Sequence, residues 1–225
     1  SLWVPLAQGP PDYFPYDSNV VYAPHIYTGG VNSGTLTEEN FQTARDEAAL
    51  FGGAPVLTGE WGADPRRAEP EGDDYFLQHQ AWQDQFHFGA ALWTWRESCG
   101  DPHKAGDYRA ARVPYVWGEF EVDCNTNEIT GPRTDVILQL TRPVLRAAPG
   151  RLQAFSYEHG NGRFEASATG ASAGTLVLFY PVSIHGQPGT ERSDGLQDLQ
   201  WMEAPGGNAY LQATVTESDW LLVLR

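Results

Sequence analysis

Residues 55–63, PVLTGEWGA, place one glutamate, Glu60, at the end of a short apolar run and between two glycines. An apolar run bounded by proline and glycine is typical of a buried strand. Gly59 and Gly62 would let another chain segment or a ligand approach the carboxylate closely. The carboxyl ends of buried strands carry the functional side chains of (β/α)8 barrels. Glu60 is therefore a candidate functional residue, with an ordinary surface salt bridge as the alternative.

The sequence around this run predicts a strand followed by a helix three times. Strands are expected at 20–27, 55–60 and 90–95. Helices are expected at 37–51, from the cap at Asp73 and Asp74 to Gly89, and at 133–141. Such alternation is typical of parallel βαβ units, so the expected fold class is α/β.

Polar and aromatic side chains gather at the carboxyl ends of all three expected strands. They are His25 and Tyr27 on the first, Glu60 on the second, and Trp93, Trp95 and Arg96 on the third. In a barrel these ends open onto one face, so we expect the side chains to converge there. Trp93 and Trp95 should point to the same side of their strand, because side chains alternate along a strand.

The composition argues against several kinds of partner. The chain has 225 residues, of which 29 are acidic and 14 basic, and a formal charge of −15. This excess of negative charge argues against nucleic-acid binding and against docking on an anionic membrane. An apolar stretch of about 18 residues is absent from the sequence, so no transmembrane segment is expected. The eight Trp and ten Tyr residues have two possible interpretations, as side chains packed in the core or as platforms that bind sugars.

The two cysteines, Cys99 and Cys124, lie in loop-like sequence and are expected to form a disulfide. A disulfide implies an oxidising compartment, so we expect a secreted protein. His79, His87 and His103 show no recurring metal-ligand spacing, and the cysteines have no neighbouring histidines. No metal site is therefore expected.

From residue 142 the pattern changes to short β-forming segments separated by turn residues. Strands are expected at 151–158, 163–169, 175–180, 209–216 and 220–224. Asn161-Gly162 is a strong hairpin signal. We therefore expect a barrel part at 1–141 and a β-sandwich domain at 142–225, joined through 142–150. The long loop expected at 96–132 either borders a cleft or is a packed structural excursion.

Three motifs together resemble the C-terminal half of a retaining glycoside hydrolase of family 5, in clan A. They are His25-Ile26-Tyr27, Gly59-Glu60-Trp61-Gly62 and Trp93-Thr94-Trp95, at the positions of the sixth, seventh and eighth barrel strands. Within that family the chain is most similar to endoglycoceramidases and related glycosylceramidases. Those enzymes follow the barrel with a β-sandwich, and the segment Thr141-Arg142-Pro143-Val144-Leu145 resembles their junction.

The resemblance implies a role for each matching residue. Glu60 would be the catalytic nucleophile, Tyr27 would donate a hydrogen bond to it, and His25 would stand beside the same site. The indoles of Trp93, Trp95 and Trp61 would contact the substrate, and we favour Trp95 as the platform of a sugar subsite. No cofactor is expected.

The second carboxyl group of a retaining mechanism has no counterpart in the sequence. It should lie roughly 5–5.5 Å from the nucleophile and act as acid and then as base. The family places it in an Asn-Glu pair at the end of a fourth strand, which this sequence lacks. Asn127-Glu128 lies after the eighth strand and is interpreted as a turn. Glu97, Glu119 and Glu121 are candidates on position alone.

Three parallel strands cannot close a barrel, and their open edges would expose backbone groups. We therefore expect a second polypeptide, cut from the same precursor before Ser1, to carry strands one to five and the acid/base. Three functions stay open. They are hydrolysis of a glycolipid (glycan released from ceramide, or one sugar from a lipid or sterol), hydrolysis of a β-glucan polysaccharide, and non-catalytic binding of carbohydrate or lipid.

Overall fold

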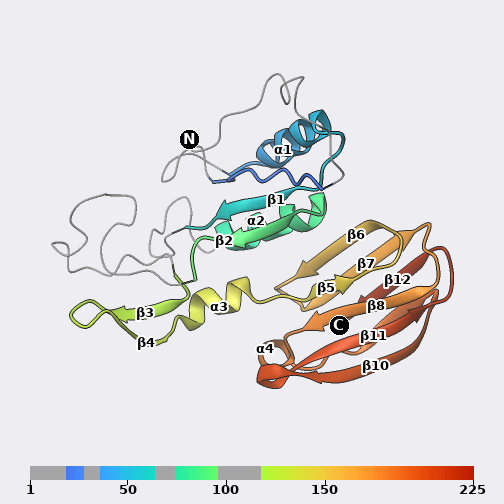
Figure 1. Cartoon of the computed structure of the whole chain (residues 1–225). Helices are drawn as coiled ribbons and strands as arrows, with labels where there is room; N and C mark the ends of the chain where they lie inside the picture. The colour runs from blue at the N-terminus through green and yellow to red at the C-terminus, as the bar shows by residue number, and fades with distance from the viewer. Residues whose placement is uncertain (1–18, 28–35, 64–73, 96–117) are drawn as a thin grey trace. The chain divides into compact units, whose positions relative to one another are not determined.

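The computed structural model of the chain describes residues 19–27, 36–63, 74–95 and 118–225 (Figure 1). The chain divides into two compact units, Ser1–Gln139 and Leu140–Arg225. The first contains parallel strands and helices, and the second is almost entirely antiparallel sheet. Within the described ranges, every helix is too short or too polar to cross a membrane.

The first unit is built on parallel strands. β1 (Leu57–Trp61) pairs in parallel with β2 (Gly89–Leu92). On the other side of β1, residues 20–27 run parallel to it through bridges of Tyr22 with Val56 and of His25 with Glu60. The predicted third strand is too long, because β2 ends at Leu92 and residues 93–95 are not part of the strand. The alternation argument for Trp93 and Trp95 therefore does not apply.

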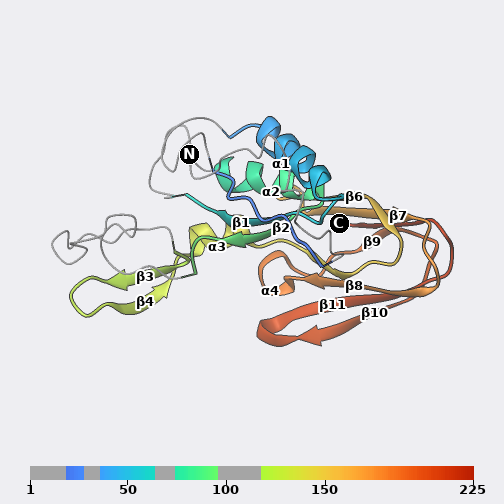
Figure 2. The same cartoon turned by 45° about the horizontal axis from the view of Figure 1, so that its top comes forward.

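Two helices lie on one face of this sheet, α1 (Glu38–Leu50) and α2 (Asp74–Phe86) (Figure 2). Helix α1 begins where the Thr37 N–H donates to Asn40 Oδ1 at 2.9 Å. Two glutamates in its first turn interact favourably with the positive end of the helix dipole. Its predicted apolar face is buried at Phe41, Ala44 and Ala48. The buried face of α2 is more polar than predicted, because His79, Gln80, Gln83 and Asp84 lie on it beside Phe76.

The exposure of side chains distinguishes the two faces of the sheet. Along residues 21–26, Pro24 and Ile26 are buried and Tyr22 is half-buried, whereas Val21 is 52% exposed. On β1, Thr58 is fully buried and Leu57 is 38% exposed. One face thus packs under the helices, and apolar side chains are exposed on the other. This pattern is consistent with part of a barrel, whose inner face needs further strands to cover it.

The predicted loop 96–132 contains regular structure in its last part, so that prediction is wrong there. β3 (Phe120–Asp123) and β4 (Glu128–Pro132) form an antiparallel hairpin, followed by α3 (Thr134–Leu140). Asn127 has a positive φ of 58° in the hairpin turn, as expected for turn chemistry. Residues 96–117 lie outside the described ranges. They include Cys99, so the Cys99–Cys124 disulfide, and the secretion inferred from it, stay predictions.

The second unit consists of two four-stranded antiparallel sheets. Their orders are β10-β11-β8-β5 and β6-β7-β12-β9. Five strands lie where the sequence predicts them: β6 (Arg151–Glu158), β7 (Arg163–Thr169), β8 (Gly174–Tyr180), β11 (Asn208–Val215) and β12 (Trp220–Leu224). Three strands and two short helices were not predicted: β5 (Val144–Ala147), α4 (Val182–His185), β9 (Thr190–Asp194), β10 (Leu196–Ala204) and η1 (Pro205–Gly207).

The core of this unit is made by alternate residues of facing sheets. Leu178 and Leu211 from one sheet and Phe164 and Leu222 from the other are fully buried in one cluster. The predicted Asn161-Gly162 signal forms the turn between β6 and β7, where Gly162 has a positive φ of 73° that suits glycine.

A group of aromatic and basic side chains lies at one end of the second unit. The ring of Tyr157 is 4.8 Å from that of His159 and 5.4 Å from that of His185. His185 Nε2 is 2.9 Å from the carbonyl oxygen of Thr141. Burial, and then the nearby His185 and Arg142, lower the pKa of His159 to about 4.

Acidification is expected to weaken the fold through His159. A folded-state pKa of about 4, against an ordinary 6.5, means that the unfolded chain binds the proton first, so stability falls as the pH drops from 6.5 towards 4. The full shift corresponds to about 3 kcal/mol, and we expect about 1 kcal/mol because the side chain is only half-buried. Urea unfolding near pH 7 and near pH 4.5 should show a smaller loss of stability in His159→Gln than in the wild type. Equal losses would contradict this assignment.

Candidate active site

The carboxylate of Glu60 lies near the carboxyl end of β1, held by two side chains of the neighbouring segment. The phenol of Tyr27 donates to Glu60 Oε2 at 3.1 Å. His25 Nδ1 is 3.1 Å from the same oxygen. The Glu60 side chain is 26% exposed and that of His25 is 38% exposed, so the pair is accessible without being fully solvated. The structure thus brings together three of the predicted site residues.

The backbone explains why these side chains meet. His25 lies opposite Glu60 in the parallel ladder, and the N–H of Ile26 donates to the carbonyl of Glu60 at 3.1 Å. Gly59 allows the close approach predicted for it, since a Cβ there would lie 3.2 Å from His25 Cδ2 and 3.3 Å from the carbonyl oxygen of Ala23. Any larger residue at position 59 would press on the imidazole that contacts Glu60.

The geometry favours a carboxylate that is held in one orientation. Both side-chain contacts end on Oε2, which fixes the rotamer of Glu60 and leaves Oε1 as the oxygen for another group. A carboxylate aimed in this way, at an accessible strand end, can act as a nucleophile or as a base. The structure describes no group of three or more His, Cys, Asp or Glu side chains that could hold a metal ion, within the ranges given above.

The three tryptophans of the predicted site lie in different surroundings. Trp61 is 5% exposed and stacks on His79 of α2 with ring centroids 4.4 Å apart, so the structure does not bring its indole to the Glu60 carboxylate. Trp93 is half-buried, and its backbone N–H donates to the backbone carbonyl of Trp61 at 2.7 Å. Trp95 is 64% exposed and its ring meets Phe120 edge-on at 4.8 Å. Trp95 is therefore the indole most open to a ligand.

The remaining acidic candidates among the described residues lie on or beside the β3–β4 hairpin. The N–H of Glu119 donates to the carbonyl of Trp95 at 3.2 Å, and burial raises the pKa of the Glu119 carboxyl. Glu121 is 3.7 Å from the guanidinium of Arg133. Glu128 begins β4 directly after the turn, and Glu97 lies outside the described residues.

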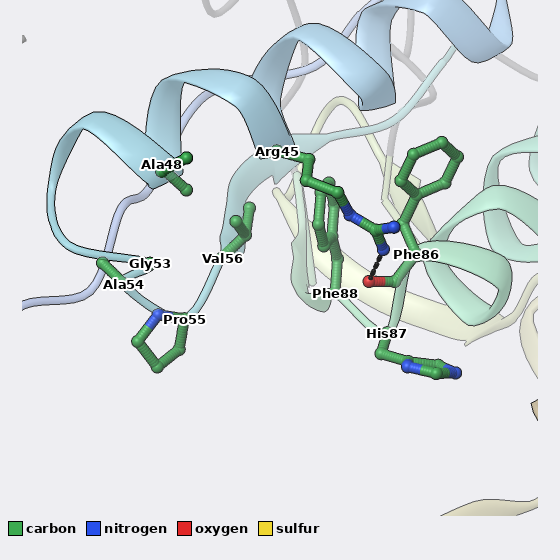
Figure 3. Close-up of a pocket in the computed structure, with 10 residues that line it drawn as sticks. Arg45, Ala48, Gly53, Ala54, Pro55, Val56, Phe86, His87 and Phe88 are labelled. Carbon is green, nitrogen blue, oxygen red and sulfur yellow. Dashed lines mark hydrogen bonds between the residues drawn. The ribbon is translucent and has the colours of Figure 1, made fainter. Parts of the chain in front are cut away.

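A separate pocket of about 290 Å³ lies at the opposite, amino-terminal end of β1 (Figure 3). Arg45 reaches from α1 over the ring of Phe86 at 4.5 Å and donates to the Phe86 carbonyl at 2.7 Å. A cation at this point satisfies the carbonyl of the last residue of α2 and interacts favourably with the negative end of the helix dipole. The rest of the lining is mostly apolar and contains no carboxylate, so this pocket lacks the chemistry of the Glu60 site.

The sequence does not predict that His79 is buried next to the segments that carry the Glu60 site. The sequence treats it as one of several scattered histidines, whereas the structure places it fully buried between α2 and the strands. Its neighbour four residues on, Gln83, is also buried and bonds to it. Two polar residues one helical turn apart, His79 and Gln83, are the signal that could have pointed to a buried hydrogen-bonded pair.

Comparison with known proteins gives a likeness in fold alone. No protein-family model matches the sequence, and no curated protein matches it. Endo-glycoceramidase II from Rhodococcus sp., in a five-membered iminocyclitol complex, matches with a TM-score of 0.60 at 17% identity, over 91% of this chain and 42% of that one. Sterylglucosidase 1 from Cryptococcus neoformans matches with a TM-score of 0.55 at 13% identity, over 91% and 37%. This chain therefore spans less than half the length of either structure, and it shares the fold of that part.

Proposed function

We propose that this chain is part of a retaining glycoside hydrolase and that Glu60 is its nucleophile. The observation that carries the proposal is the carboxylate of Glu60 near the end of β1, with Tyr27 and His25 both 3.1 Å from Oε2. The fold likeness to an endo-glycoceramidase and a sterylglucosidase supports the same class of reaction. One structure of the Rhodococcus protein is of its lactosyl–enzyme intermediate, which supports a covalent mechanism for the proposed reaction.

In the proposed first step, Glu60 Oε1 forms a bond to the anomeric carbon while the bond from that carbon to the aglycone oxygen breaks. The departing oxygen takes its proton from a second carboxyl group. In the second step that group accepts a proton from water, the water oxygen bonds to the same carbon, and Glu60 leaves as a carboxylate. Two displacements at one carbon retain the β configuration.

The acid/base residue is proposed to lie outside residues 1–225, on a second polypeptide that supplies the missing strands. The chain spans 42% of the endo-glycoceramidase structure, which supports a larger enzyme. The exposed apolar side chains of Val21 and Leu57 are where further barrel strands would pack.

A glycolipid is the proposed substrate class. The Rhodococcus protein has been found in complex with ganglioside GM3, and the other matching protein is a sterylglucosidase. The exposed indole of Trp95 offers an aromatic face on which a pyranose ring can stack. We propose cleavage between glycan and ceramide, with Trp95 as the platform of the sugar subsite.

Substrate choice can be tested with the complete enzyme, meaning this chain together with the rest of the barrel. A glycosphingolipid, a sterol β-glucoside and a β-1,4-glucan are offered separately, and the products are identified by mass spectrometry. We expect an intact oligosaccharide and ceramide as products. NMR spectra should show the β anomer of the released oligosaccharide before the α anomer appears. Cleavage of the sterol glucoside alone would overturn endo-cleavage, and cleavage of the glucan alone would overturn the glycolipid class. Binding without any cleavage would mean a non-catalytic module.

A further inference from the structure

His79 contacts both of the chain segments that carry the Tyr27–Glu60 pair. It lies on α2 and is fully buried. Its Nε2 is 3.2 Å from the carbonyl oxygen of Ile26, the residue before Tyr27. Its ring stacks on that of Trp61, the residue after Glu60, at a centroid distance of 4.4 Å and an interplanar angle of 29°.

The hydrogen bonds define which ring nitrogen carries the proton. A carbonyl oxygen can only accept, so His79 Nε2 must carry the proton and donate to Ile26. The side-chain nitrogen of Gln83 is 2.7 Å from His79 Nδ1, and an amide nitrogen donates. Gln83 therefore holds the tautomer that points an N–H at Ile26, as a partner on the second nitrogen does for other functional histidines.

The carbonyl that His79 binds belongs to the peptide group that leads into Tyr27. On its other side Ile26 is held by β1, because its N–H donates to the Glu60 carbonyl at 3.1 Å. The backbone just before Tyr27 is thus fixed from both sides, by β1 and by His79. The Tyr27 phenol must reach Glu60 Oε2 from this backbone, over the observed 3.1 Å.

We propose that His79 is a positioning residue for the reaction at Glu60, acting through the backbone of Tyr27. This inference rests on the proposed glycosidase function, because its expected effect is on the kcat of glycoside hydrolysis. A histidine that only filled the core could be replaced by an apolar residue of similar size without a specific effect on turnover. A positioning residue needs the donor at Nε2, so its effect should follow the hydrogen bond and not the volume.

Two substitutions separate these roles in the complete enzyme. His79→Leu keeps an apolar volume and removes the donor, whereas His79→Gln keeps an N–H that can reach the Ile26 carbonyl. We expect kcat to fall about 10-fold in His79→Leu with KM unchanged, and to recover to within about 3-fold of wild type in His79→Gln. Phe86→Leu is the matched control, because Phe86 is buried on the same helix but packs near Arg45, away from Glu60. Its kcat should stay within about 2-fold of wild type.

A double substitution tests whether the effect passes through Tyr27. In a Tyr27→Phe background, His79→Leu should lower kcat no further, since the bond that it positions is already gone. Additive losses would overturn the inference, as would equal losses in His79→Leu and Phe86→Leu or a failure of His79→Gln to restore kcat. If the wild-type enzyme cleaves no glycoside at all, it is the proposed function that fails.

A measurement that does not need activity tests the hydrogen bond itself. In ¹⁵N NMR spectra, His79 should show a protonated Nε2 and an unprotonated Nδ1, and His79→Leu should move the amide resonance of Tyr27 while Phe86→Leu leaves it in place. A protonated Nδ1 with an unprotonated Nε2, or an unmoved Tyr27 resonance, would overturn the positioning role whether or not the enzyme is active.

Discussion

Glu60→Gln is expected to lower kcat by about 10⁴-fold or more while KM for the substrate stays within a few-fold of wild type. The amide has the size and shape of the carboxylate but cannot form the glycosyl ester, so binding survives and the first displacement does not occur. The measurement is steady-state hydrolysis of a glycosphingolipid by the complete enzyme. The fold should be unaffected, because Glu60 is 26% exposed and contributes no buried ion pair to the core.

Glu165→Gln is the matched control for this substitution. Glu165 is also a partly exposed strand glutamate, 32% exposed and 2.6 Å from Arg163, but it lies on β7 in the second unit. Its activity should stay within about 2-fold of wild type, since a surface ion pair contributes little. A Glu60→Gln enzyme with more than a tenth of the wild-type kcat would rule out Glu60 as the nucleophile.

Tyr27→Phe is expected to lower kcat/KM by about 10- to 100-fold. The phenol donates to a carboxylate at 3.1 Å, and hydrogen bonds to charged groups contribute about 1.5–3 kcal/mol. Without this donor Glu60 loses one of the two contacts that aim it at the anomeric carbon, so the loss should fall mainly on kcat. The measurement is kcat and KM on the same glycosphingolipid, together with the melting temperature.

Tyr210→Phe removes a phenol of similar exposure from β11 in the second unit, where the ring packs against Phe179. It should change neither kcat nor KM. If Tyr27→Phe and Tyr210→Phe behave alike, or if the loss in Tyr27→Phe is explained by a lower melting temperature, Tyr27 does not act on Glu60.

The parts of the fold that the sequence predicts well are those with a clear hydrophobic period. Helix α1 and strands β7 and β12 bury regular sets of apolar residues, and their bounds were predicted closely. Strand β9, TERSD, was missed because all five of its side chains are polar and its place depends on pairing with β12. The hairpin of β3 and β4 was missed because its strands are only four and five residues long and none of their residues is buried, so they carry no clear hydrophobic period.

In the candidate site, the residues at strand ends could be predicted from the sequence, whereas the contacts that depend on helix packing could not. Glu60, Tyr27 and His25 could be found because each lies at or near the carboxyl end of a predicted strand, and parallel pairing then brings them together. Trp61 follows Glu60 directly, so its side chain turns to the helices, and its predicted role as a substrate contact is not part of the proposed function. The contacts of His79 depend on how α2 packs, which no local pattern specifies.

The central claim is that Glu60 forms the covalent bond to the sugar. A 2-deoxy-2-fluoro β-glycoside slows both displacements, but a good leaving group keeps the first faster than the second, so the glycosyl–enzyme should accumulate and survive an acid quench. Peptide mass spectrometry of the quenched enzyme should then show one fluoroglycosyl group on the peptide that contains residues 55–63, attached at Glu60, and none in Glu60→Gln. An unlabelled Glu60, or a label on another carboxylate such as Glu119, would contradict the account.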